Sequence, residues 1–188
     1  DQATIDQTFG LGWYKYDPEA AGKLLIKHGF SQDADGMWLL PDGTPWKIEV
    51  LDRVDTSHHA FKNCNAAVQQ WKQFGIDAVY IANDAHVTLS DEGNFQVTCD
   101  WPAFEPWGAG VDLIRTLDVF NSAFVADSIG EATSGHESRW SSPEMDAVLE
   151  TLRTTDPADT EAVRLAGIEG LKLLVAEMPG IPTYGYAG

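Results

Sequence analysis

Aromatic and acidic side chains gather between positions 100 and 107, and they are the residues best suited to hold a ligand. Asp100 and Trp101 end the segment FQVTCDW, and Phe104, Glu105 and Trp107 follow closely. Aromatic faces beside a few polar groups suit sugar rings or apolar peptide side chains. The alternative is that these aromatic rings simply fill a core. We take all five residues as candidate ligand-binding residues.

Carboxylates in the same region also allow a hydrolytic interpretation. Asp100, Glu105 and Asp112 could supply the two carboxyl groups of a glycan hydrolase. The sequence alone does not pair them, and it contains no GxSxG, P-loop or GxGxxG motif. A binding protein returns its ligand unchanged, whereas a hydrolase does not. Turnover would separate the two, and the residues in this region leave both a ligand-binding protein and a glycan hydrolase open.

Three further groups of residues have side chains of types that occur in binding or metal sites. Arg139 could reach a cleft, although a surface arginine beside a packed Trp140 is the simpler reading. Asp33 and Asp35 resemble part of a calcium loop, but Thr44 stands where the closing acid is needed, which favours a turn. His58-His59 lacks the HExxH spacing of a zinc site. We keep Arg139 as a candidate and expect no metal and no other cofactor.

Composition excludes several classes of protein. The net charge of −17 over 188 residues argues against nucleic acid as a partner, because nucleic-acid binders concentrate Lys and Arg. No apolar run is long enough to span a membrane. The sequence opens at Asp1 without a basic start or an apolar block, so we expect a targeting segment to have been lost with the rest of a longer protein.

The two cysteines, Cys64 and Cys99, admit two interpretations. One bridge is possible in an oxidising compartment, and a strand–helix–strand layout could bring them to the same edge of a sheet. Free cysteines are, however, among the most buried residues of proteins. We expect two free, buried thiols.

The elements that would position these side chains alternate between helices and strands. A helix is expected after Asp17-Pro18, then a hairpin over Phe30–Pro45, and the short links that follow predict a right-handed βαβ unit. We predict strands over Trp46–Leu51, Ile76–Ala82, Phe95–Trp101 and Ile181–Tyr186, and helices over Ala60–Phe74, Ala85–Leu89, Pro143–Leu152 and Thr160–Glu177. Pro102–Gly135 reads as irregular, which is typical of a functional or mobile segment.

The order of several motifs resembles a known family. The segments YDPEAAGKLLIKHGF, DADGMWLLPDGTPWKIEVL and AAVQQWKQFGIDAVYI are followed by RWSSPEMDAVLETLRTTDPADTEAVR and AEMPGIPTYGY. In this order they resemble the family 5 extracellular solute-binding proteins, which are the oligopeptide, dipeptide and nickel binding proteins of ABC importers. Each motif alone is weak, but together they cover nearly the whole chain.

The resemblance implies a fold and a function. The fold would be α/β, a periplasmic-binding-protein-like type II lobe with a mixed sheet flanked by helices. Residues 1–188 would form a single lobe, the second of two, with the first lobe absent. The protein would be a monomer in the periplasm or another extracytoplasmic space, tethered to the membrane through the missing N-terminus. It would be a ligand-binding protein rather than an enzyme, with the glycan hydrolase as the alternative. It would hold a small ligand between two lobes and deliver it to the membrane permease of an ABC importer.

One departure from the family pattern bears on the ligand. Peptide-binding members carry "GWxxDYxxP", in which the Asp pairs with the amino terminus of the peptide. Here Phe104 occupies that offset from Trp101, and Glu105 is the nearest acid. A buried ammonium group needs a charged partner. We therefore favour an oligosaccharide as the ligand and keep a short peptide as the second possibility. A further alternative for the function is a peptide-sensing domain that contacts a membrane receptor.

Overall fold

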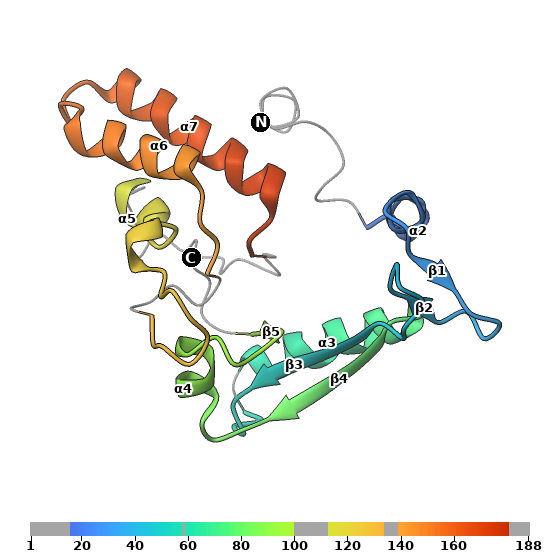
Figure 1. The fold of residues 1–188 in the computed structure, drawn as a ribbon. Coiled ribbons are helices and arrows are strands. Elements are labelled where there is room, and N and C mark those ends of the chain that lie inside the picture. Colours follow the sequence, from blue (N-terminus) through green and yellow to red (C-terminus); the bar gives the residue numbers. More distant parts are fainter. Residues whose placement is uncertain (1–15, 58, 100–112, 134–138, 181–188) are drawn as a thin grey trace. The chain divides into compact units, whose positions relative to one another are not determined.

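The computed structural model describes residues 16–57, 59–99, 113–133 and 139–180, which form two compact units (Figure 1). The sheet unit holds the described residues up to Ser90 together with 94–99. The helical unit holds Asp91–Gly93 and the described residues from Leu113 onward. That residues 1–188 make a single lobe stays a prediction.

A three-stranded parallel sheet is the frame of the sheet unit. Strands β3 (Lys47–Asp52), β4 (Asp77–Ala82) and β5 (Val97–Thr98) lie in the order β4-β3-β5. β3 pairs with β4 along its whole length, from Lys47 opposite Asp77 to Asp52 opposite Ala82. Helix α3 (His59–Gln73) connects β3 to β4 and covers one face of the sheet (Figure 1). The βαβ unit predicted from the sequence is thereby confirmed.

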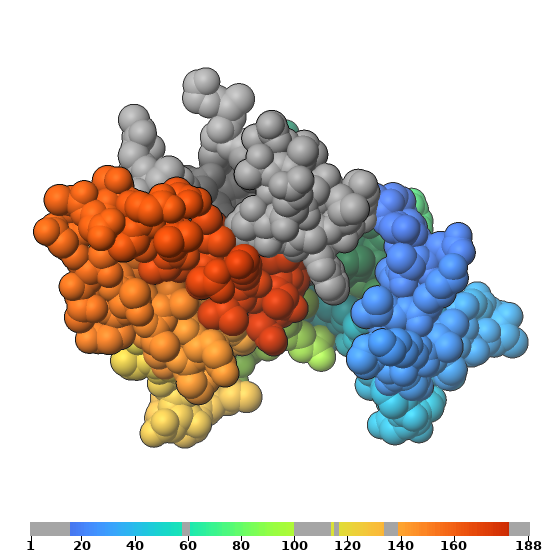
Figure 2. Space-filling model, turned by 90° about the horizontal axis from the view of Figure 1, so that it is seen from above, coloured from blue at the N-terminus to red at the C-terminus, as the bar shows by residue number. Residues whose placement is uncertain are grey.

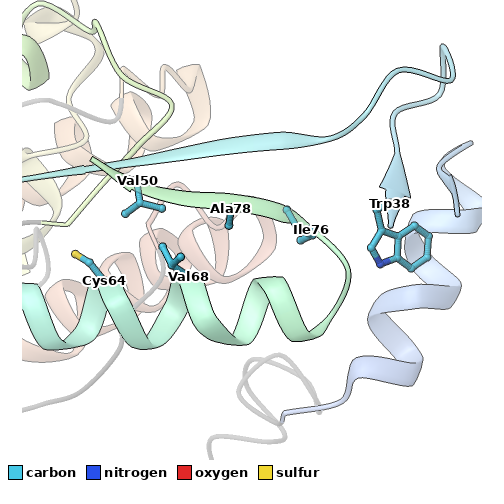
Figure 3. Packing of buried hydrophobic residues seen from close by; sticks show 6 residues of the cluster. All are labelled: Trp38, Val50, Cys64, Val68, Ile76 and Ala78. Carbon is cyan, nitrogen blue, oxygen red and sulfur yellow. The ribbon is translucent and has the colours of Figure 1, made fainter. Parts of the chain in front are cut away.

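Alternation along the strands and helical spacing along α3 create a shared core. Val50 and Ala78 point from the sheet toward α3, and Cys64 and Val68 point back from the helix (Figure 3). A spacing of four residues places both side chains of α3 on one face. Burial of such side chains contributes about 1.5–3 kcal/mol each to folding. The helix is therefore held on the sheet by this apolar contact.

The amino-terminal part of the sheet unit adds a helix and a hairpin. Helix α2 (Pro18–Lys27) begins with Pro in its first turn, and the Asp17 carboxylate accepts a hydrogen bond of 2.9 Å from the amide of Ala20. β1 (Ser31–Gln32) and β2 (Trp38–Leu39) pair antiparallel, as the predicted hairpin requires. Figure 2 shows α2, in blue, at the surface, and none of its residues is buried.

Two contacts join the hairpin to the end of α3. The indole Nε1 of Trp38 donates a 2.9 Å hydrogen bond to the carbonyl oxygen of Phe74. Gly75 follows with φ of 94°, and a Cβ there would lie 2.3 Å from the carbonyl oxygen of Gly36. Only glycine combines this dihedral angle with so close an approach. The predicted end of the helix at Gly75 is confirmed, with this packing as its reason.

The helical unit is built from three α-helices and a short 3₁₀ helix in the described ranges. These are α5 (Leu113–Asp118), η1 (Ser122–Phe124), α6 (Pro143–Thr154) and α7 (Thr160–Glu177). Their buried side chains are Leu117, Phe120, Met145, Leu149, Leu152 and Leu174. Figure 2 shows α6 and α7 side by side in orange and red. Among the helices that the structure describes, none combines the length and apolarity needed to cross a membrane.

The helices and strands predicted over described residues agree with the structure in type, although their ends differ, and helical structure also occurs where none was predicted. β5 (Val97–Thr98) is shorter than the predicted Phe95–Trp101. Directly before it, the side-chain Oε1 of Gln96 accepts a 2.7 Å hydrogen bond from the amide of Glu49 in β3. α5 and η1 lie in the stretch that was predicted to be irregular. Helix α4 (His86–Asp91) matches the predicted short helix. The predicted strand Ile181–Tyr186 lies outside the described residues.

The two cysteines form a disulfide, so the prediction of free thiols is wrong. Their Cα atoms are 6.1 Å apart. Cys64 is fully buried on the sheet-facing side of α3, and Cys99 directly follows β5. The burial argument treated each thiol alone, whereas the parallel layout brings this part of the helix to the end of the neighbouring strand. The bond therefore ties the edge strand β5 to α3.

Replacing both cysteines by alanine tests this tie. We expect the free energy of unfolding to fall by about 2–4 kcal/mol, because the bond closes a loop across a sequence separation of 35 residues. Hydrogen exchange should accelerate at Val97–Cys99 more than within β4. The comparison is wild type with and without a reducing agent. Two titratable thiols in the denatured, unreduced wild type would contradict the bridge.

Candidate functional site

The carboxyl ends of the parallel strands define the candidate site. β3, β4 and β5 end at Asp52, Ala82 and Thr98 along the same edge of the sheet. In open α/β sheets ligands bind outside the carboxyl ends of the strands. We call this the carboxyl edge. It belongs entirely to the sheet unit.

A buried carboxylate anchors the carboxyl edge. Asp52 is fully buried, and its Oδ2 accepts a 3.1 Å hydrogen bond from the hydroxyl of Tyr80. Its Oδ1 accepts a 2.7 Å bond from the backbone amide of Arg53 and lies 3.8 Å from the Nε of the same residue. A buried carboxylate without such partners would be strongly unfavourable. The network therefore fixes the end of β3 against β4.

Tyr80 acts as a hydrogen-bond donor within this network. Burial, and then the charge of Asp52 and the hydrogen bond to it, raise the pKa of Tyr80 to about 12. The phenol thus keeps its proton at neutral pH. The ring of Phe61 meets the ring of Tyr80 edge-on, with centroids 5.5 Å apart. This contact from α3 holds the phenol in place.

The β5 side of the carboxyl edge is held by hydroxyl groups and the disulfide. The Thr98 hydroxyl donates to the carbonyl oxygen of Leu51 over 3.3 Å, and it lies 3.5 Å from the hydroxyl of Ser90 in helix α4. Cys99 adds a backbone bond of 3.3 Å to Leu51 and the covalent link to Cys64. The chain that continues from Cys99 therefore starts from a fixed point.

Most of the predicted ligand-binding residues follow that fixed point in the sequence. Asp100, Trp101, Phe104, Glu105 and Trp107 lie outside the described residues, as does Asp112 of the alternative hydrolytic site. Their roles stay predictions. In the described part of the chain, no group of three or more His, Cys, Asp or Glu side chains is arranged to hold a metal ion.

Arg139 is the described member of the predicted site, and its guanidinium binds backbone carbonyls. It donates to the carbonyl oxygens of Ser128 at 2.9 Å and Asp91 at 3.0 Å, and also to that of Glu131. Gly93 leaves room for it, because a Cβ there would lie 2.3 Å from Nε. These contacts give Arg139 a structural role within the helical unit. A role in ligand binding stays a prediction.

Trp140, which the sequence places beside this arginine, packs inside the helical unit. Its ring meets that of Phe120 nearly at right angles, with centroids 5.7 Å apart. Edge-to-face pairs of this kind add about 0.5–1.5 kcal/mol beyond their buried area. The reading of a packed tryptophan beside Arg139 therefore agrees with the structure.

Sequence reasoning missed Asp52 and Tyr80. The available signal was the position of Asp52 and Arg53 directly after the predicted strand Trp46–Leu51, where a charged residue meets the carboxyl edge. Tyr80 could not be paired with Asp52 from the sequence, because its partner is fixed by the parallel register of β3 and β4.

Comparisons with known proteins give structural matches only. No protein-family model matches the chain, and no curated protein sequence matches it significantly. A periplasmic oligopeptide-binding protein of Thermotoga maritima with bound mannohexaose superimposes with a TM-score of 0.77 at 19% identity, over 96% of this chain and 32% of that one. NikZ from Campylobacter jejuni with Ni(L-His) gives 0.68 at 20%, over 88% and 31%.

A third solved structure also matches nearly all of this chain over only part of its own length. The oligopeptide-binding protein AppA from Bacillus subtilis with a nonapeptide gives a TM-score of 0.59 at 12% identity, over 88% of this chain and 31% of that one. The chain thus spans about a third of the length of these proteins. They are solute-binding proteins rather than enzymes. At the level of fold the predicted resemblance is confirmed: the chain folds like one part of an oligopeptide- or nickel-binding protein.

Replacing Tyr80 by phenylalanine tests the buried network. We expect the loss of the bond to Asp52 to reduce the free energy of unfolding by about 1–3 kcal/mol at neutral pH. Tyr16→Phe is the control, because that side chain is exposed. Denaturant titration of both variants measures the difference. An unchanged stability of Tyr80→Phe would show that Asp52 does not depend on the phenol.

The raised pKa of Tyr80 predicts that the stability of the protein depends on pH. Folding raises the pKa of Tyr80 from its ordinary value of 10 to about 12, so the folded state favours the neutral phenol. This contribution is complete below pH 10 and is lost as the pH rises toward 12. Stability of the wild type should therefore fall more steeply above pH 10 than that of Tyr80→Phe. The free energy of unfolding is measured by denaturant titration at each pH. An equal decrease with pH in the wild type and in Tyr80→Phe would contradict this prediction.

Replacing Arg139 by lysine separates its two possible roles. A lysine cannot bond several carbonyls in one plane, so we expect a loss of about 1–3 kcal/mol in the free energy of unfolding. Arg164→Lys is the matched control, because its exposed pair with Glu161 contributes at most about 1 kcal/mol. Unchanged stability of Arg139→Lys, combined with weaker ligand binding by the full-length protein, would assign the residue to the ligand instead.

Proposed function

We propose that this chain is the second lobe of an extracytoplasmic solute-binding protein that captures a ligand for an ABC importer. The observation that carries the proposal is the fold. Nearly all of the chain superimposes on about a third of several binding proteins. The remaining two-thirds of such a protein would supply the first lobe and the other wall of the cleft.

Capture needs no chemical step from the protein. The ligand binds between two lobes and favours the closed arrangement, because it contacts both walls only there. The candidate residues Asp100, Trp101 and Trp107 follow the carboxyl edge in the sequence. Cys99 fixes the start of that segment to α3. Such an anchor reduces the cost of ordering the site when the ligand binds.

An oligosaccharide is the ligand that we favour. The matched protein of Thermotoga maritima was solved with mannohexaose, whereas AppA was solved with a nonapeptide. This chain carries Phe104 where the family's peptide binders carry an acid for the amino terminus of the peptide. The neighbouring aromatic residues Trp101 and Trp107 suit the apolar faces of sugar rings. A short peptide is the second ligand to be tested.

The partner and the compartment follow from the same proposal. The protein would work as a monomer outside the cytoplasm, in the periplasm or tethered to a membrane, and would deliver its ligand to an ABC permease. The net charge of −17 opposes contact with nucleic acid. A disulfide persists in an oxidising compartment, which agrees with an extracytoplasmic location.

Tryptophan variants of the full-length protein test the proposal. Trp101→Ala and Trp107→Ala should each weaken ligand binding at least about tenfold, because a stacked aromatic at a binding hot spot contributes about 2 kcal/mol. Their melting temperatures should stay near that of the wild type. Calorimetric titration with oligosaccharides and short peptides measures affinity, and mass spectrometry checks that the ligand is unchanged.

Trp38→Ala is the matched control. Trp38 is 3% exposed in the core of the sheet unit, so its truncation should cost about 3–5 kcal/mol of stability. If Trp101→Ala or Trp107→Ala behaves like this control, the aromatic residues belong to a core. Cleavage of an oligosaccharide would replace capture by the hydrolase that Asp100, Glu105 and Asp112 could form.

A further inference from the structure

The face of the sheet turned away from α3 carries a small pocket of its own. Along β3 and β4, Glu49, Leu51, Val79 and Ile81 alternate with the residues that face α3. Val79 is 40% exposed, so this face is open at that strand. At its carboxyl end lies a pocket of about 210 Å³ whose lining includes Glu49, Leu51, Ile81, Asn83, Phe95 and Gln96. We call it the sheet-face pocket.

The polar lining of the sheet-face pocket is held in place by backbone contacts. The side-chain oxygen of Gln96 accepts a 2.7 Å bond from the amide of Glu49. That of Asn83 accepts a 2.9 Å bond from the amide of Ala85. With each oxygen engaged, the NH₂ group of each carboxamide offers donors to a ligand. The exposed carboxylate of Glu49 adds an acceptor.

The apolar lining completes a chemistry that suits one class of ligand. Leu51 and Ile81 come from the sheet, and Phe95 adds an aromatic ring beside them. A sugar ring combines C–H groups that pack on such surfaces with hydroxyl groups that bond to amides and carboxylates. The lining contains no Lys or Arg, which does not favour an anionic ligand. Its volume is below the 300–1,000 Å³ of pockets for drug-sized ligands, so one ring is the matching size.

We propose that the sheet-face pocket binds one neutral sugar ring. The inference rests on the proposed function, to which it adds a subsite for an oligosaccharide on described residues of the sheet unit. This subsite consists of residues other than the candidate residues at positions 100–107. A longer oligosaccharide that reaches it would gain affinity from the additional ring.

Nuclear magnetic resonance of the 188-residue chain tests the inference directly. The probes are D-glucose and D-mannose at millimolar concentrations, with glycylglycine as the peptide comparison. We expect saturable amide shifts confined to Leu51, Ile81, Asn83 and 94–96 with a sugar and none with the dipeptide. Phe95→Leu should weaken sugar binding about threefold or more, because it keeps apolar volume and removes the aromatic face. Phe124→Leu, in the helical unit, is the matched control and should bind as the wild type.

A second variant keeps the inference testable if Phe95→Leu fails to fold. Glu49 is exposed, so Glu49→Ala should leave the fold intact and weaken sugar binding about tenfold by removing a charged acceptor. The absence of saturable shifts with either sugar would overturn the inference, as would equal shifts with glycylglycine or unchanged affinity in both variants. If the full-length protein still captures a solute, only the subsite fails. If it captures none, the proposed function itself fails.

Discussion

The parallel pairing of β3 with both of its neighbours is the constraint on which the sheet unit depends. It sets Tyr80 beside Asp52 and brings the ends of three strands to one edge. It also turns Val50 and Ala78 toward α3, which then buries Cys64 next to the end of β5. A shift of β4 by one residue would turn Tyr80 and Ala78 to the opposite face of the sheet. The register therefore fixes both the core and the carboxyl edge.

The two sides of β3 are secured by different means. β4 is bonded to β3 over six residue pairs, whereas β5 is bonded over two. On the β5 side, side chains and a covalent bond supplement the two backbone pairs. The side chains of Gln96 and Thr98 form hydrogen bonds with the backbone of β3, and Cys99 is joined to α3 by the disulfide. Because the candidate ligand-binding segment begins right after Cys99, the weaker strand is also the one that the proposed function uses. Its anchoring links the stability of the unit to the site.

Local sequence patterns predicted the helices and strands. Contacts between residues far apart in the sequence could not be predicted from it. Alternation over Trp46–Leu51 and the glycine at Gly75 depend on neighbouring residues, so the strand and the end of α3 were predictable. The disulfide was not, because the distance between Cys64 and Cys99 depends on the packing of α3 across the sheet. Arg139 was read as a surface or cleft residue, since nothing in the sequence shows where the carbonyls that it binds would lie. The resemblance to binding proteins, which rests on the order of several motifs, is confirmed at the level of fold.

Capture without chemistry is the central claim, and it is tested most directly by small-angle X-ray scattering of the full-length protein with and without an oligosaccharide. A two-lobed binding protein closes around its ligand by hinge motion. The radius of gyration should therefore decrease in a saturable way, and the oligosaccharide recovered afterwards should be intact. A radius that no oligosaccharide or short peptide changes, or a ligand recovered as fragments, would contradict the account.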